Sequence, residues 1–503
     1  MTNRTRGMVL CLCGMLCGGL PARGQDWAAT SHVEPVVQPT EYQQLVERLN
    51  ELEAEVTALK APESVQPANA EYYIPPAPAA ELGSMAYGYA QATAPAAPTK
   101  PKYPTVNVNG FFQADTVYFS QDATNRAQLG DIQDGSDLRR TRLSASGAVA
   151  DNVNYFIQMD FGFFGRPTFT DIWGEVKNVP WLGTVRAGQW KQPYSLEVPT
   201  SVRYQTFMER SLLFQTFDPF RHIGVGFYNN SEDENWTWAM SGFRVGQDQF
   251  GNDIGDSGGW STAGRLTHLL WYNDFKDAEK RLEYLHLGGA FWFGDPAADT
   301  FRYATIPEAF VGAFGVPAGT VPGTSKVQVP TIANGTPPFV DTGAIPTNTF
   351  THLGSELLWV HGPFTWQSEV QLANLAQIGG PQLTFWGYYS EVMLFLTGES
   401  RTYNRKLGTL DRITPLRPYI RESDCEKGPG AWELAYRVSY IDLNDQNISG
   451  GRLADLTTGL NWYLNGYTKV QFNYIHAALN RNFNGVNGPS DADIYGVRFQ
   501  VDF

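Results

Sequence analysis

Cysteine is scarce in this 503-residue sequence, and most of it is confined to the beginning of the chain. Three of the four cysteines, Cys11, Cys13 and Cys17, lie close to the N-terminus, and only Cys425 stands in the remainder. If the first segment is removed, no intrachain disulfide can form and no cysteine-ligated zinc site is available. The sequence therefore predicts neither a disulfide framework nor a metal site, and it offers no cofactor motif.

Long apolar runs are also missing. Beyond residue 24, no stretch approaches the roughly 20 apolar residues that a membrane-spanning helix needs, and the mean hydropathy of −0.30 is low. Yet hydrophobic residues make up 42% of the chain, aromatic residues 14%, and there are 50 glycines. A polar chain rich in aromatics and glycine is typical of short strands that have one apolar and one polar face.

Residues 1–24 contain no acidic residue and read as a secretory signal peptide. Arg4 and Arg6 precede an apolar run at 8–20, and Ala22-Arg23-Gly24 offers a cleavage site. The alternative is a buried N-terminal helix. Removal of this segment takes away three arginines, so the net charge falls from −14 by three, to −17. Such an acidic chain is not expected to bind nucleic acid.

The next part of the chain divides into an N-terminal segment at 25–40, a short coiled coil at 41–60 and a linker at 61–102. Leu45, Leu49 and Leu52 follow heptad spacing, and charged residues occupy the other faces. A lone amphipathic helix is the alternative reading. The linker is rich in Pro and Ala and is therefore expected to be stiff and extended.

From residue 103 to residue 503 the hydrophobic pattern has period two. In the last strand Tyr495, Val497 and Phe499 alternate with Arg498 and Gln500. The chain ends on an aromatic residue of the apolar set, as outer-membrane barrels commonly do. The ~400 residues allow about 16 strands with short and long connections. We therefore expect an all-β fold, a transmembrane antiparallel β-barrel of 16 strands, preceded by the coiled-coil helix and the Pro/Ala-rich linker.

Seven motifs follow one another along the barrel region. They read DLRRTRL at 137–143, TFMER at 206–210, GYY at 387–389, FLTGE at 395–399, GAWEL at 430–434, GGRL at 450–453 and GLNWYL at 459–464. In this order they resemble the phosphate-selective porins of the O and P type. The resemblance implies a homotrimer of 16-stranded barrels in the outer membrane of a Gram-negative-type envelope, surrounded by lipid. It also implies an inward-folded loop that narrows each pore and presents Arg and Lys to anions.

The first candidate pore-lining residues are Arg139, Arg140 and Arg142. By strand parity Arg140 and Arg142 face the lumen, whereas Arg139 has lipid-facing parity and is expected to bend toward the rim at the start of the strand. Arg suits phosphate because its planar fork can donate to two oxygens. The alternative is ordinary solvated lumen charge, since barrel interiors are generally polar.

A second basic group lies in the segment that matches the inward loop of the family. This segment mixes basic residues with many aromatics, as expected of a loop packed inside a barrel. Pairing with nearby carboxylates, as structural ties, is the alternative role for these cations. The basic candidates are Lys191, Arg203, Arg210 and Arg221, and the carboxylates are Glu197, Glu209 and Asp218.

An enzymatic reading finds little support in the sequence. Residues 255–259 read Gly-Asp-Ser-Gly-Gly, but a serine nucleophile needs a histidine base in a matching context, and neither His32 nor His222 has one. Motifs for zinc peptidases and phosphate-cradling loops are absent. We therefore expect no enzyme. The sequence predicts a passive porin for inorganic phosphate or other small anions. The alternatives are a general diffusion porin and a structural barrel that contacts the cell wall through its coiled coil.

Overall fold

The computed structural model describes residues 48, 102–162, 167–246, 254–275, 281–309, 311–314, 335–420, 427–482 and 485–503. Sixteen strands form a closed antiparallel barrel, because the main sheet has 17 strands and β10 only extends one edge of β15. This confirms the predicted fold class. The wall strands are β1 (Asn107–Gln121), β2 (Gly135–Ala150), β3 (Val153–Asp160), β4 (Thr168–Val179), β5 (Gly183–Lys191), β6 (Arg221–Asn230), β7 (Trp236–Arg244), β8 (Trp260–Asp274), β9 (Leu282–Gly294), β15 (Ile345–His361), β16 (Phe364–Gln377), β17 (Gln382–Phe395), β20 (Ala431–Asp445), β21 (Ile448–Tyr463), β22 (Thr468–Asn480) and β23 (Pro489–Asp502).

Period-two alternation puts apolar side chains on the outside of the wall and polar ones inside. In β23, Tyr495 is 49% and Phe499 is 41% exposed, whereas Arg498 between them is 1% exposed. A lumen filled with inward-folded segments explains this contrast, because inner side chains are covered by protein while outer ones face lipid. The two faces of the final strand are therefore those that the sequence predicts.

The barrel closes where the first and last strands meet. β1 pairs with β23 from Phe111 opposite Asp502 to Gln121 opposite Ala492. The backbones of Gly110 and Phe503 add two further hydrogen bonds of 2.9 Å each. The terminal residue therefore belongs to the wall, and no strand edge is left unpaired at this seam.

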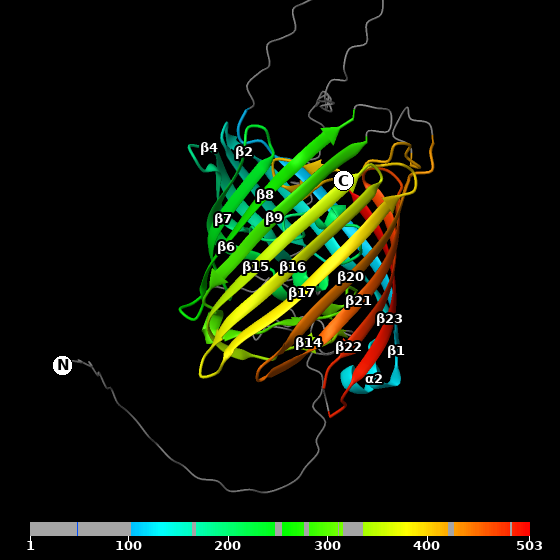
Figure 1. Cartoon of the computed structure of the whole chain (residues 1–503). Helices are drawn as coiled ribbons and strands as arrows, with labels where there is room; N and C mark the ends of the chain where they lie inside the picture. The colour runs from blue at the N-terminus through cyan, green and yellow to red at the C-terminus, as the bar shows by residue number, and fades with distance from the viewer. Residues whose placement is uncertain are drawn as a thin grey trace, which may run out of the picture. The chain divides into compact units, whose positions relative to one another are not determined.

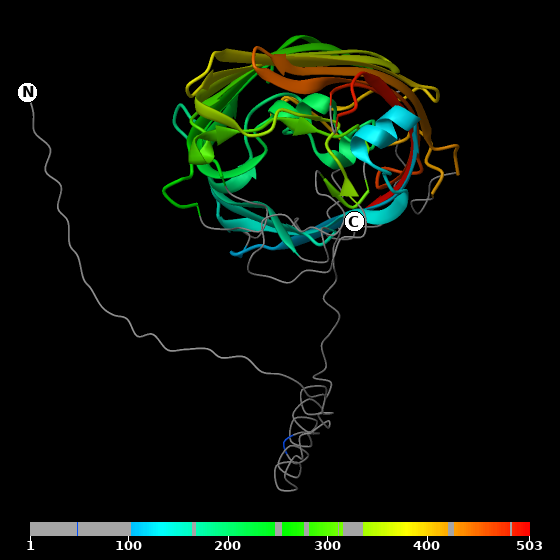
Figure 2. The same cartoon turned by 90° about the horizontal axis from the view of Figure 1, so that it is seen from below.

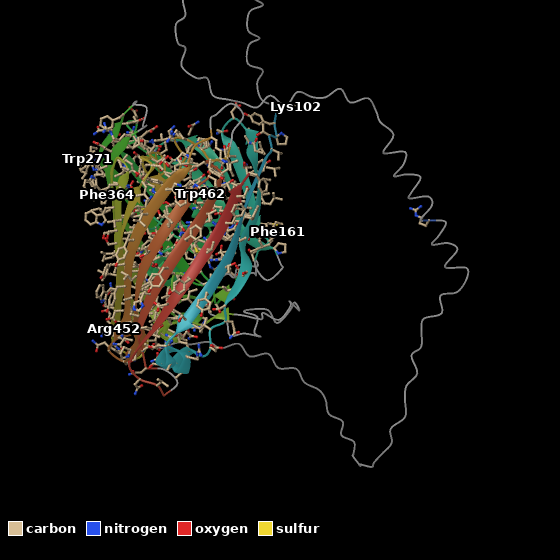
Figure 3. The ribbon with its side chains drawn as sticks, turned by 90° about the vertical axis from the view of Figure 1, so that its right-hand side faces the viewer. Lys102, Phe161, Trp271, Phe364, Arg452 and Trp462 are labelled. Atoms are coloured by element: carbon tan, nitrogen blue, oxygen red, sulfur yellow. The ribbon has the colours of Figure 1, made fainter. Side chains whose placement is uncertain are left out.

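The two ends of the barrel differ. The chain enters β1 and leaves β23 at one end, here called the terminal end, and α2 (Ala123–Leu129) lies at the other (Figure 1). Figure 3 places Trp271, Phe364 and Trp462 toward the terminal end, and such aromatic belts mark the interface of a membrane with water. Among the described residues, no helix has the length and apolar character required to span a bilayer.

Three connections send residues into the lumen, and Figure 2 shows them inside the ring of strands. The inward loop (192–220) joins β5 to β6, the β9–β15 loop spans 295–344, and the β17–β20 segment spans 396–430. The inward loop carries η1 (Val202–Tyr204) and α3 (Leu212–Phe217). The β9–β15 loop carries η2 (Ala297–Asp299), β10 (Thr300–Phe301), β11 (Ala304–Thr305), β12 (Ala313–Phe314), β13 (Gly335–Thr336) and β14 (Val340–Asp341), and the β17–β20 segment carries β18 (Tyr403–Asn404) and β19 (Thr409–Leu410).

The expectations for the N-terminal part fall outside the described residues. These are the signal peptide at 1–24, the segment at 25–40, the coiled coil at 41–60 except residue 48, and nearly all of the linker at 61–102. They stay predictions.

Candidate pore constriction

The inward loop rests on the wall formed by β21 and β22. The side-chain amide of Asn461 donates to the carbonyl of Thr206 at 2.7 Å, and the Lys469 ammonium donates to the carbonyl of Gln205 at 2.8 Å. Buried loop carbonyls need such donors because water is excluded from them. The wall thus holds the backbone of the loop inside the barrel.

Glu209 ties the inward loop to the adjoining part of the wall, around the seam of β1 and β23, through three arginines. Its carboxylate lies 2.9 Å from Arg139, 3.0 Å from Arg140 and 2.7 Å from Arg498. Burial by itself raises the pKa of the Glu209 carboxyl, but the three guanidinium groups outweigh burial and hold the pKa well below its usual range. Glu209 is therefore a charged anchor, as the alternative reading of the sequence allows.

Arg139 points into the lumen, so the expectation that it bends toward the rim is wrong. The register of β1 with β2 shifts between Gln113 and Asp115, which places an extra residue in β2. Such a bulge reverses the alternation locally. Leu138 therefore faces outward, 53% exposed, and Arg139 turns inward to Glu209.

Two other candidate cations on the wall are each paired with one carboxylate. Arg142 donates to Asp160 at 2.8 Å, and Arg221 donates to Asp171 at 2.7 Å. The exposed fractions of these two arginine side chains are 10% and 8%. Both cations therefore reach the lumen surface from the β2–β6 side of the wall. The paired carboxylates compensate much of their positive charge.

Lys191 and Arg203 are different, because neither has a carboxylate within 4.0 Å among the described residues. The Lys191 ammonium donates to two carbonyls of the inward loop, at 3.1 and 3.0 Å. The Arg203 guanidinium lies 5.5 Å from the centre of the Phe111 ring, and its Nε donates to a neighbouring hydroxyl. Both side chains are only partly buried. They are the candidates with the least compensated charge.

Arg210 is buried inside the inward loop, with 3% of its surface exposed. It donates to the carbonyls of Glu197 and Thr200, both at 2.9 Å, and its guanidinium lies 4.2 Å from the centre of the Phe214 ring. These contacts fold the loop back on itself. Arg210 is thus positioned as a brace of the loop.

Glu308 joins the inward loop to the β9–β15 loop and to the wall. Its carboxylate accepts from the Leu212 amide at 3.2 Å, from Arg437 Nε at 2.8 Å and from the Thr457 hydroxyl at 2.8 Å. The start of α3 is fixed in this way. Period-two alternation in β20 gives Arg437 lumen-facing parity, but it carries no sign of this partner, which lies 129 residues away.

Asp218 closes the inward loop near its end. It accepts from the Ser195 hydroxyl at 3.0 Å and from the side-chain amide of Gln371 at 2.7 Å. Burial raises the pKa of the Asp218 carboxyl to about 8, because these two hydrogen bonds offset only part of the loss of hydration. The group is therefore mainly protonated at neutral pH.

Sequence reasoning missed Arg186, which lies on the lumen side of β5. It donates to Glu175 at 2.7 Å and stacks on Trp173, with 3.8 Å between its central carbon and the ring centre. A signal was present, because apolar Val185 and Ala187 flank Arg186 and give it lumen parity. Without a match to the family's motifs, that signal does not separate Arg186 from other lumen charges.

The β17–β20 segment enters the lumen from the terminal end, which the sequence also did not reveal. Arg265 of β8 holds it by donating to the Gly408 carbonyl at 2.8 Å and to the Leu407 carbonyl at 3.3 Å. The same guanidinium donates twice to Glu356 of β15, at 2.7 Å each. The segment is thus fixed to β8 through an arginine that is itself paired with β15.

Comparison with known proteins gives the same assignment as the fold. The family described as phosphate-selective porin O and P matches residues 106–289 and 325–503. Porin O of Pseudomonas aeruginosa is 23% identical over 420 residues, covering 79% of this chain and 88% of that protein. An uncharacterised protein of Caulobacter vibrioides is 25% identical over 379 residues, covering 73% of this chain and 68% of that protein.

Two solved structures are also similar to this chain. OmpT, an outer membrane protein of Vibrio cholerae, aligns with a TM-score of 0.48 at 10% identity, covering 80% of this chain and 99% of that one. The anion-selective porin from Comamonas acidovorans aligns with a TM-score of 0.45 at 11% identity, covering 80% and 100%. From the extent of the family match, the chain belongs to the phosphate-selective porin O and P family, and it is an outer-membrane porin.

Proposed function

We propose that this porin passes small anions by passive diffusion and favours phosphate. The supporting observation is that the predicted cations at the inward loop and the facing wall outnumber the carboxylates paired with them. Among the described residues, the seven predicted cations share three carboxylates as direct ion-pair partners. The carboxylates are Glu209, Asp160 and Asp171. Fixed positive charge offsets the hydration that an anion loses at a narrow point.

The seven cations divide into two roles. Arg140 and Arg210 are 6% and 3% exposed and have their donors engaged, so they position the loop. The solute-facing group consists of the partly exposed residues Arg139, Arg142, Lys191, Arg203 and Arg221. Several weak sites in series let an anion bind and leave again, as conduction requires.

The family resemblance carries the remaining parts of the proposal. It supports assembly as a homotrimer in the outer membrane, with inorganic phosphate as the favoured solute. Ion pairing at Arg142 and Arg221 favours the alternative of a general diffusion porin, because paired charges select weakly. The uncompensated charges of Lys191 and Arg203 weigh against that alternative.

The test targets those two uncompensated cations. The trimer is reconstituted in planar bilayers, and the reversal potential in a KCl gradient is measured for wild type and for a Lys191→Gln, Arg203→Gln double variant. We expect the preference for chloride over potassium to fall severalfold. Arg126→Gln, at an exposed position on α2, serves as the matched control and leaves the preference unchanged. An unaltered preference in the double variant contradicts the assigned role.

Envelope tethering is a separate proposal and rests on the heptads at 41–60 alone. Deleting residues 25–102 tests it. If the envelope weakens while single-channel conductance is unchanged, the coiled coil contacts the cell wall. If the envelope keeps its integrity, the tethering role is excluded.

A further inference from the structure

A cavity of about 230 Å³ lies inside the barrel beside the inward loop. The wall strands β5 to β8 form one side of it, the inward loop forms another, and the β17–β20 segment borders it toward the terminal end. A single water molecule needs only about 10–15 Å³ of such space, so the cavity admits a solute several times larger than water. Orthophosphate alone leaves most of such a space to water.

The lining of the cavity is mainly apolar. An inorganic anion has no apolar surface that such a lining could cover. The inward loop contributes Pro193 and Pro199, and the wall contributes Trp190, Tyr228 and Ala239. Apolar lining gains free energy only by covering apolar surface of a solute. Cavities of this kind, with a few polar groups at defined places, are typical of sites for small organic molecules.

Two cations that also line the cavity have donors left over. Lys191 uses two of its three ammonium hydrogens on carbonyls of the inward loop. Arg186 directs Nε and Nη2 to Glu175, and Nη2 also to the Tyr228 hydroxyl. Its Nη1 meets no acceptor among the described residues, and 18% of the side chain is exposed. The existing bonds hold both cations in place, so binding an anion costs little further ordering.

We propose that this cavity is a binding site for a small organic phosphate, with a sugar phosphate as the fitting class. The phosphate group accepts from Lys191 and Arg186. The C–H face of the sugar covers Trp190, Pro193 and Ala239, and the sugar hydroxyls meet the polar rim. The inference rests on the proposed anion pathway, because the solute reaches the cavity through the same lumen. To the proposed function it adds organic phosphates as a second class of solute and the cavity as a second binding site.

The test compares three solutes as blockers of chloride current through single trimers in planar bilayers. The solutes are glucose 6-phosphate, inorganic phosphate and glucose. We expect glucose 6-phosphate to block at about tenfold lower concentration than inorganic phosphate, and glucose not to block. Equal or weaker block by glucose 6-phosphate in the wild-type trimer overturns the proposal without the need for any variant.

A cavity-filling variant locates the effect. Ala239→Phe fills the cavity from β7, and we expect it to reduce block by glucose 6-phosphate to the level of inorganic phosphate. Ser146→Phe adds the same ring to the lumen face of β2, outside the cavity lining, and leaves the preference intact. A preference that survives Ala239→Phe contradicts the site. If glucose 6-phosphate blocks but inorganic phosphate does not, the phosphate preference of the pore fails and the cavity site stands.

Discussion

Arg140 of β2 and Glu209 of the inward loop form an ion pair of 3.0 Å, with their side chains 7% and 6% exposed. A residue that the sequence offers as a phosphate ligand is therefore fixed to a loop carboxylate. The same carboxylate holds Arg139 and Arg498. Three cations on one loop residue make the position of the inward loop depend on Glu209.

Replacing Glu209 with Gln is therefore expected to destabilise the inward loop. Removing one partner from a buried charge network typically costs about 3–5 kcal/mol, because the remaining charges lose their compensation. We expect a lower urea midpoint of unfolding in lipid vesicles, measured by tryptophan fluorescence, and greater open-channel current noise. The control is Glu234→Gln, whose exposed partner Lys406 lies 3.6 Å away. Equal midpoints for the two variants would show that Glu209 is no anchor.

The solute-facing cations and the two cations that position the loop, Arg140 and Arg210, are expected to respond differently to substitution. Arg203→Ala removes a charge without breaking an ion pair, so we expect phosphate block to weaken about tenfold, equivalent to ~1.4 kcal/mol, with the unfolding midpoint unchanged. Arg210→Ala leaves two loop carbonyls without donors, so we expect the free energy of unfolding to fall by about 1–3 kcal/mol per lost partner. Concentration series of phosphate and urea titrations measure both quantities. The reverse pattern contradicts the division of roles.

The Asp218 carboxyl makes stability depend on pH. Its pKa of about 8 in the folded barrel lies above the usual value near 3.9, so the folded state keeps a proton that the unfolded chain releases. The stabilisation is complete below the unfolded pKa and is lost as pH rises through the folded pKa. We expect stability to fall between about pH 4 and pH 8.

Asp218→Asn removes this titration while keeping the contacts with Ser195 and Gln371 in neutral form. The slope of the urea midpoint against pH is expected to be shallower in the variant than in the wild type over that interval. Identical slopes for wild type and variant would mean that Asp218 has an ordinary pKa.

The close packing at the seam between the first and last strands can be tested by adding one methyl group at Gly110. A Cβ built on Gly110 lies 2.4 Å from the Phe503 ring and 2.8 Å from the Arg142 carbonyl. Backbone cannot move aside easily, so we expect Gly110→Ala to lower stability by about 1–3 kcal/mol. Gly289→Ala is the matched control, since its nearest atom is 3.8 Å away. Heat-induced mobility shifts on gels compare the two, and equal behaviour argues against a tight seam.

Much of the wall could be predicted from the sequence because a strand has only two faces. Strand parity alone places the side chains of Arg498 and Arg437 on the lumen face. The position of the turn between β15 and β16 follows from Gly362 and Pro363. Arg139 did not follow, because one bulge reverses the alternation and the bulge has no clear mark in the sequence.

The interior could not be predicted in the same way. Glu209 meets Arg498 across 289 residues, and Arg401 of the β17–β20 segment pairs with Glu433 inside the barrel. Such contacts depend on how loops fold into the lumen, which periodicity does not encode. The basic residues were recognised by type, while their division into braces and solute-facing cations required the structure.

Phosphate block of chloride current through the wild-type trimer tests the central claim most directly. The reversal potential in a KCl gradient is measured first, and phosphate is then added in steps at constant ionic strength. We predict anion selectivity and a current that falls and saturates as phosphate rises. Cation selectivity, or a chloride current that phosphate leaves unchanged, contradicts the proposal that this porin favours phosphate.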